Sequence, residues 1–233
     1  MHNVSGEMGL ECIESMARQF YGYGCWNAPY WFLGPEPGMA KKDMARKADD
    51  LEKRCAAWQR LGGGELLDCI EHHRAFGLLR WHAAPSELQR TWKRLMLVLF
   101  GFKGKIQSPE ALKRYQATEW GTARGETCAI EMSSLAAHDR SVKRDRRTFR
   151  DERIDFIRCM IRQYQPTFIL MYGTGQWKRI AEASFDTEGV CPIGQTVAMV
   201  TLYPTAPIRA NTDEKWLEFG RRLRRRCETR GRS

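Results

Sequence analysis

The sequence predicts an α/β protein: a three-layer α/β/α arrangement in which a central four-stranded parallel sheet carries a mostly helical insertion after its first strand. Four short apolar runs, each closed by turn residues, alternate with amphipathic segments of helical period. Several successive residues in each run are apolar, which is typical of strands buried on both faces and therefore of a parallel sheet. Neither an internal repeat nor a Pro/Ser-rich linker divides the 233 residues, so we expect one domain over residues 1–233.

The expected strands are Tyr30–Leu33, Thr127–Met132, Thr167–Tyr172 and Thr196–Leu202. The expected helices are residues 41–61, residues 87–100 after an N-cap at Ser86, residues 148–165 before Pro166, and a last helix from a cap at Asn211, Thr212 or Asp213 to about Arg226. Ligands of such folds bind outside the carboxyl ends of the strands. The loops expected to hold a site are therefore residues 34–39, 133–139, 173–176 and 203–211.

The charge of the chain favours a polyanionic partner. Thirty-eight Lys and Arg residues against 28 Asp and Glu residues give a net charge of +10 at pH 7. Seven basic and three acidic residues lie within 140–153, and seven arginines with one glutamate lie within 221–233. Arginine binds phosphate oxygens in a bidentate manner. We therefore expect a nucleic acid as the partner, with a merely solubilising basic surface as the alternative.

The composition also limits the location and the cofactors. The longest apolar run, Leu95–Phe100, is far shorter than the roughly 20 residues that span a bilayer. Acidic residues near the N-terminus stand where a signal peptide has an apolar core. We expect a cytoplasmic protein with no membrane partner, and a monomer because nothing in the sequence demands an oligomer.

The cysteines and histidines give no clear metal pattern. No two of the eight cysteines form a CxxC pair, so the sequence predicts reduced, mostly buried cysteines, no metal site and no cofactor. His72 and His73 are adjacent, which is poor geometry for binding one metal from a helix. With Trp81 and His82 they either line a pocket in the inserted helices or lie on a helix surface.

Two loops combine rigid backbone with chemically useful side chains. In the first, Pro35 and Pro37 stiffen the chain around Glu36, and Gly34 and Gly38 let a ligand approach closely. A carboxylate held in this way suits the orientation of water or the stabilisation of a developing cation. The alternative is an ordinary Pro/Gly turn with an exposed glutamate.

The last loop, residues 203–209, has two prolines, the Tyr203 phenol and the Thr205 hydroxyl, then Ile208 followed by Arg209. An apolar wedge beside a phosphate-binding cation is what an enzyme needs to push a base out of a duplex. The alternative is a tight strand-to-helix connection with Ile208 in the core.

These motifs resemble those of the uracil-DNA glycosylase superfamily. WFLGPEPG is similar to its first motif, with Glu36 at the position of the water-activating Asp or Asn, and LYPTAPIR is similar to its second. FILMYGTGQW is similar to its third strand and the helix that follows. The resemblance implies a monofunctional DNA glycosylase that flips a base and hydrolyses its N-glycosidic bond, leaving an abasic site.

Two departures imply a base other than uracil. Tyr203 replaces the usual histidine of the second motif, and residues 130–134 offer no asparagine to read the uracil edge. Defence members of this superfamily attack modified phage DNA, so the resemblance implies a modified cytosine such as glucosylated hydroxymethylcytosine. The alternatives are a uracil-DNA glycosylase of base-excision repair and a non-catalytic nucleic-acid-binding module of the same fold.

Within this hypothesis Glu36 and Tyr203 are the catalytic residues: Glu36 orients the water and stabilises the sugar cation, and Tyr203 donates to the departing base. The residues expected to bind the base are Pro35, Pro37, Gly38, Ser133, Ser134 and Glu131. Glu131 is alternatively a second catalytic carboxylate or a helix-capping or ion-pairing residue. The residues expected to bind DNA are Thr205, Ile208, Arg209, Arg144, Arg146 and Arg147.

A competing hypothesis is that the protein is a Rossmann-like enzyme that holds a nucleotide cofactor at Gly173-Thr174-Gly175. This motif lacks the third glycine and an obvious ribose-binding acid after the next strand, which disfavours it.

Overall fold

The computed structural model describes residues 4–35, 47–105, 107–135, 149–173, 176–207 and 211–230. Its helices are α1 (Val4–Gln19), α2 (Lys47–Arg60), α3 (Cys69–Ala75), α4 (Arg90–Lys103), α5 (Pro109–Thr118), α7 (Arg150–Tyr164), α8 (Trp177–Ala181) and α9 (Asp213–Arg230). Its strands are β1 (Gly22–Tyr23), β2 (Tyr30–Gly34), β3 (Leu66–Leu67), β4 (Thr127–Glu131), β5 (Phe168–Tyr172), β6 (Val190–Ile193) and β7 (Thr196–Thr201).

The protein is α/β, and its described residues form one mixed seven-stranded sheet in the order β3-β1-β4-β2-β5-β7-β6. The four strands predicted from the sequence are β4, β2, β5 and β7, which pair in parallel at the centre of this sheet. The predicted four-stranded sheet is nevertheless incomplete, since β1 pairs antiparallel with β4 and β6 pairs antiparallel with β7.

The missed strands have weak local signals. β1 and β3 contain two residues each, too few to show a period. β6 contains Pro192, which favours an edge strand because proline donates no backbone hydrogen bond. It joins β7 through a two-residue turn at Gly194, whose φ of 58° suits glycine.

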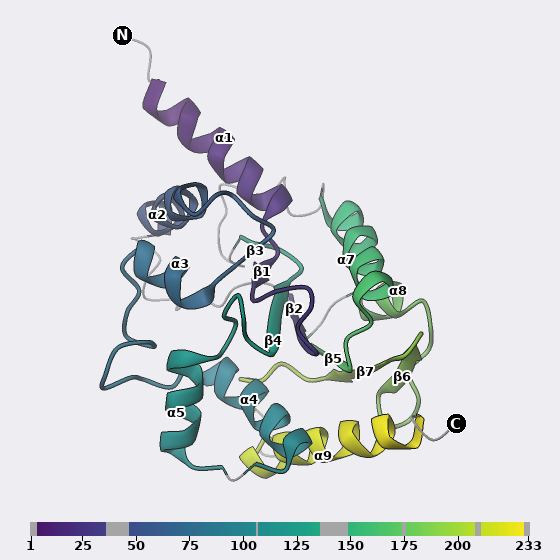
Figure 1. Ribbon diagram of the computed structural model, residues 1–233. Coiled ribbons are helices and arrows are strands. Elements are labelled where there is room, and N and C mark those ends of the chain that lie inside the picture. Colours follow the sequence, from purple (N-terminus) through teal and green to yellow (C-terminus); the bar gives the residue numbers. More distant parts are fainter. Residues whose placement is uncertain are drawn as a thin grey trace.

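Side chains on the two faces of the sheet belong to different parts of the core. Phe32, Phe168 and Leu170 pack with residues of α4, α5 and α9 on one face. Trp31, Leu33 and Ile169 pack with residues of α7 and α8 on the other. Figure 1 shows these two helix groups on opposite sides of the sheet. The apolar runs are therefore continuous because both faces of the central strands are covered.

Helix ends follow capping chemistry, with one correction. Thr212 caps α9 by accepting the Lys215 backbone amide at 3.3 Å, one of the three caps expected from the sequence. The predicted helix at 87–100 begins later: Gln89 is the N-cap of α4, and its side chain accepts the Trp92 amide at 2.6 Å. The expected cap Ser86 lies outside the helix.

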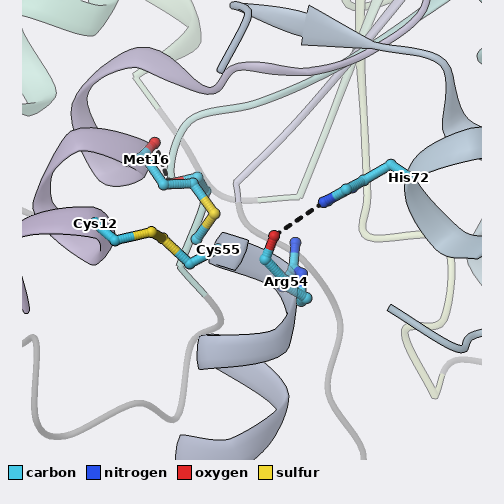
Figure 2. The surroundings of a disulfide bond; sticks show 6 residues. Cys12, Met16, Arg54, Cys55 and His72 are labelled. Carbon is cyan, nitrogen blue, oxygen red and sulfur yellow. Dashed lines mark hydrogen bonds between the residues drawn. A yellow bond between two sulfur atoms is a disulfide. The ribbon is translucent and has the colours of Figure 1, made fainter. Parts of the chain in front are cut away.

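Helices α1, α2 and α3 form a third apolar cluster beside the sheet. A disulfide joins Cys12 of α1 to Cys55 of α2, with the Cα atoms 6.2 Å apart (Figure 2). The expectation of reduced cysteines is wrong for this pair, because 43 positions separate the two residues and only the packing of the helices brings them together. None of the helices in the described ranges is long and apolar enough to cross a membrane.

Candidate functional site

The carboxyl ends of β2, β5 and β7 meet at one edge of the sheet, as the sequence predicts for the first and last loops. Gly173, directly after β5, has φ of +76°, and a Cβ atom there would lie 2.9 Å from Cδ2 of Tyr203 and 3.5 Å from Cδ of Pro35. Two of the predicted site residues, Pro35 and Tyr203, therefore lie against the same glycine. Gly173 keeps the space between them open because it has no side chain.

Tyr172, the last residue of β5, is a component of this edge that the sequence analysis missed. A Cβ atom on Gly34 would lie 2.2 Å from the Tyr172 hydroxyl, so the phenol lies across the end of β2. The Tyr172 and Tyr203 rings are edge-to-face, with centroids 5.9 Å apart. A polar residue closing an apolar strand immediately before a glycine is the signal that could have indicated it.

The electrostatics of this edge keep the Tyr172 phenol protonated. Burial raises the pKa of Tyr172 well above its ordinary value, and the nearby Glu131 carboxylate and Tyr203 act in the same direction. At neutral pH this hydroxyl is therefore a hydrogen-bond donor. Glu131 stands opposite Gly34 in the β2–β4 register, so it belongs to the same edge as the two tyrosines.

The two serines after β4 have structural partners. The Ser133 hydroxyl donates to the Leu135 carbonyl at 3.0 Å and accepts the Leu135 amide at 3.1 Å, closing a tight turn. The Ser134 hydroxyl is buried and donates to the Met16 carbonyl of α1 at 3.2 Å. Both hydroxyls already take part in intramolecular hydrogen bonds, which weakens the hypothesis that they read a base.

Asn211 forms hydrogen bonds to the turn at residues 203–206, directly after β7. The Ala206 amide donates to the Tyr203 carbonyl at 2.9 Å, forming a turn. The Asn211 side-chain amide donates to the carbonyls of Pro204 at 2.9 Å and Ala206 at 2.8 Å. Sequence reasoning considered Asn211 only as a helix cap, but the structure makes it the residue that shapes the turn carrying Thr205.

A basic pocket of about 380 Å³ lies between this turn and the first residues of α4. Its charged lining residues are Arg90, Lys93 and Arg94, and residues 204–207 form the opposite wall. Lys93 pairs with Asp213 at 2.6 Å and Arg94 pairs with the same carboxylate, whereas Arg90 is exposed. Cations beside a helix N-terminus form a favourable environment for a phosphate group.

A second cleft, of about 790 Å³, lies between α8 and α9, and Gly173 is among its lining residues. Trp177, Phe185 and Phe219 supply much of its apolar lining. Leu202, which also lines it, is 56% exposed. Its size lies within the range of roughly 300–1,000 Å³ that is usual for small-molecule sites.

Five arginines of α9 are paired with carboxylates: Arg221, Arg222, Arg224, Arg225 and Arg226. Arg225 contacts Glu218 at 2.7 Å, and Arg226 contacts Asp186 at 2.8 Å. Arg153, at the end of the first basic run, is 2% exposed and donates to backbone carbonyls. The sequence predicts that both basic runs bind phosphates, but Arg153, Arg225 and Arg226 already have partners within the protein.

Several predicted site residues lie outside the described residues, and their roles depend on the sequence alone. They are Glu36, Pro37, Gly38, Arg144, Arg146, Arg147, Ile208 and Arg209. Thr205 is described and exposed on the turn after β7.

One group of potential metal ligands does come together, although the sequence analysis expects none. Cys69, His73 and His82 place one ligand atom each within 4.8 Å of one another.

No protein-family model matches the chain, and no curated protein matches it. The glycosylase hypothesis therefore depends on the motifs quoted above and on the arrangement of residues at the sheet edge.

Proposed function

We propose that this protein is a monofunctional DNA glycosylase that excises a bulky modified cytosine, with glucosylated hydroxymethylcytosine as the leading substrate. One observation carries the proposal: Pro35, Gly173 and Tyr203 meet at the carboxyl ends of adjacent strands, beside a basic pocket. The proposal depends on a three-layer α/β/α arrangement with parallel central strands, in which loops at this edge converge on a ligand.

In the proposed reaction, water attacks C1′ of the deoxyribose and the N-glycosidic bond breaks. The bond's electron pair leaves with the base, while positive charge develops on the sugar. The Glu36 carboxylate faces that charge and accepts a proton from the water. The hydroxyls of Tyr172 and Tyr203 donate hydrogen bonds to the departing base, in the role that a histidine has in the superfamily.

Two features support a bulky base and a DNA substrate. The cleft of about 790 Å³ adjoins Gly173 and has room for a base that carries a sugar. The pocket lined by Arg90 and Lys93 is positioned to hold a phosphate of the flipped nucleotide's strand.

The test is base excision on matched DNA duplexes containing uracil, hydroxymethylcytosine or glucosylated hydroxymethylcytosine, with alkali to cleave abasic sites. We expect cleavage of the glucosylated substrate, abolished by Glu36→Gln and lowered roughly 10²–10³-fold by Tyr203→Phe. Glu110→Gln, an exposed carboxylate on α5, is the matched control and keeps full activity. Excision of uracil alone would instead assign the protein to uracil repair.

A non-catalytic DNA-binding module is the second candidate. It is favoured by Ser133 and Ser134, whose hydroxyls already bond within the protein. Salt-sensitive DNA binding without excision of any of the three bases would support this candidate and overturn the mechanism proposed for Glu36.

A further inference from the structure

The group formed by Cys69, His73 and His82 has the ligand types and spacing of a transition-metal site. Cys69 is the first residue of α3 and His73 lies one turn later on the same helix, so both reach the same side. His82 comes from the segment that follows α3. Nδ1 of His73 lies 3.9 Å from Sγ of Cys69 and 2.8 Å from Nε2 of His82.

These distances are close to those of a tetrahedral zinc site. Zn–N bonds of about 2.0–2.1 Å and Zn–S bonds of about 2.3 Å place neighbouring ligand atoms roughly 3.3–3.6 Å apart. The sulfur–nitrogen distance needs only a small decrease. The two imidazole nitrogens, which share a hydrogen bond at 2.8 Å, need to separate by about half an ångström.

The surroundings hold the three side chains in place. Cys69 is 0% exposed and His73 is 3% exposed. The Trp92 ring stacks on His73, with an interplanar angle of 9° and centroids 5.5 Å apart, and Trp81 packs against the same imidazole. Buried, preoriented ligands favour metal binding because little side-chain entropy is lost.

Metal binding needs neutral imidazoles and the Cys69 thiolate, and a coordinating thiol loses its proton to solvent.

The neighbouring carboxylate is already in use. Asp68 caps α3 by accepting the amides of Ile70 and Glu71, and its other oxygen accepts the Ala123 amide. Among the residues that the structure describes, no fourth Cys, His, Asp or Glu side chain joins the group.

We propose that Cys69, His73 and His82 bind one divalent transition metal of the zinc class, with water as the fourth ligand. Binding displaces the imidazole–imidazole hydrogen bond, and its proton moves to the other nitrogen of one ring. The metal ties α3 to the segment before α4, and Trp92 connects His73 to α4 itself. Arg90 and Lys93, which line the basic pocket, belong to the same helix. The metal therefore also stabilises the position of α4 at that pocket.

The test uses the full chain after treatment with a chelator, titrated with Co²⁺ and then with Zn²⁺. We expect one equivalent of Co²⁺ to give a thiolate-to-cobalt charge-transfer band and the visible bands of a tetrahedral site, both removed by Zn²⁺. Cys69→Ser removes the charge-transfer band and weakens binding by more than about 100-fold. Cys128→Ser is the matched control, since Cys128 is also a fully buried free cysteine but lies outside the group.

His82→Gln keeps the test decisive if Cys69→Ser does not fold, because His82 is only partly buried. We expect this variant to keep its fold and lose tight binding. Wild-type protein that takes up no Co²⁺, or that binds it without a thiolate band, would overturn the proposal. Equal binding by wild type and His82→Gln would do so as well.

Discussion

Replacing Arg153 with methionine tests whether the end of the first basic run is structural. The Arg153 guanidinium is 2% exposed, and burial lowers its pKa to about 10, so it remains charged at neutral pH. It donates to the carbonyls of Ala17 at 3.1 Å, Phe20 at 3.0 Å and Glu131 at 2.7 Å. It also lies over the Tyr21 ring, 4.1 Å from the centroid.

The magnitude follows from these partners. Methionine fills much of the same volume but leaves three carbonyls without this donor, and each buried unsatisfied group costs about 1–3 kcal/mol. Because some of these carbonyls accept a hydrogen bond from water after the substitution, the total loss of stability is smaller than three times the cost of one unsatisfied group. We expect the free energy of unfolding to decrease by about 3–5 kcal/mol, as when one partner of a buried charged network is removed.

The assay is urea unfolding followed by tryptophan fluorescence, with the midpoint and slope fitted together. An unchanged slope shows that the midpoint shift reports stability. Arg150→Met is the matched control, because Arg150 is exposed on the same helix. A loss below about 1 kcal/mol, or one equal to that of Arg150→Met, would refute the structural role. In that case Arg153 would again be a candidate for binding phosphate.

Three further predictions concern packing, the disulfide and DNA binding. A Cβ on Gly220 would lie 2.0 Å from the Val98 carbonyl oxygen. Gly220→Ala should therefore lower the free energy of unfolding, measured by urea titration, by about 1–3 kcal/mol. Cys55→Ser removes a cross-link spanning 43 positions, which should cost up to about 4 kcal/mol, and stability should become insensitive to reductant. Arg90→Gln should weaken DNA binding and reduce its salt slope by about 1, whereas the exposed Arg114→Gln on α5 should not. The packing prediction fails if Gly220→Ala is as stable as wild type, and the DNA prediction fails if both arginine variants bind alike.

Local patterns were sufficient to predict the central strands and the edge on which the first and last loops meet. Residues 168–172 are buried without interruption, and a continuous apolar run is readable from the chain alone. The Tyr203 loop could be placed beside Pro35 because parallel strands end at a common edge. The start of α4 could not be predicted, because the N-cap in the structure is Gln89. Glutamine is a weaker N-cap residue than the serine at position 86.

Contacts between distant segments were not readable in this way. The sequence predicts that Ser134 binds the base, yet its hydroxyl donates to the Met16 carbonyl, 118 positions away. The sequence predicts no role for Tyr172 in the site, whereas in the structure its hydroxyl lies next to Gly34. In both cases the residue type is ordinary, and the meaning comes from a neighbour contributed by another element.

The sequence by itself determined the α/β class, the four apolar strands at the centre of the sheet and the positive charge, because periodicity and composition are properties of the chain. Only the tertiary structure decided which polar groups are already bonded, which cysteines meet, and that Cys69 and His73 converge with His82. The physical reason is that side-chain partners depend on how helices pack against the sheet. That packing is set by many weak contacts between residues far apart in the sequence.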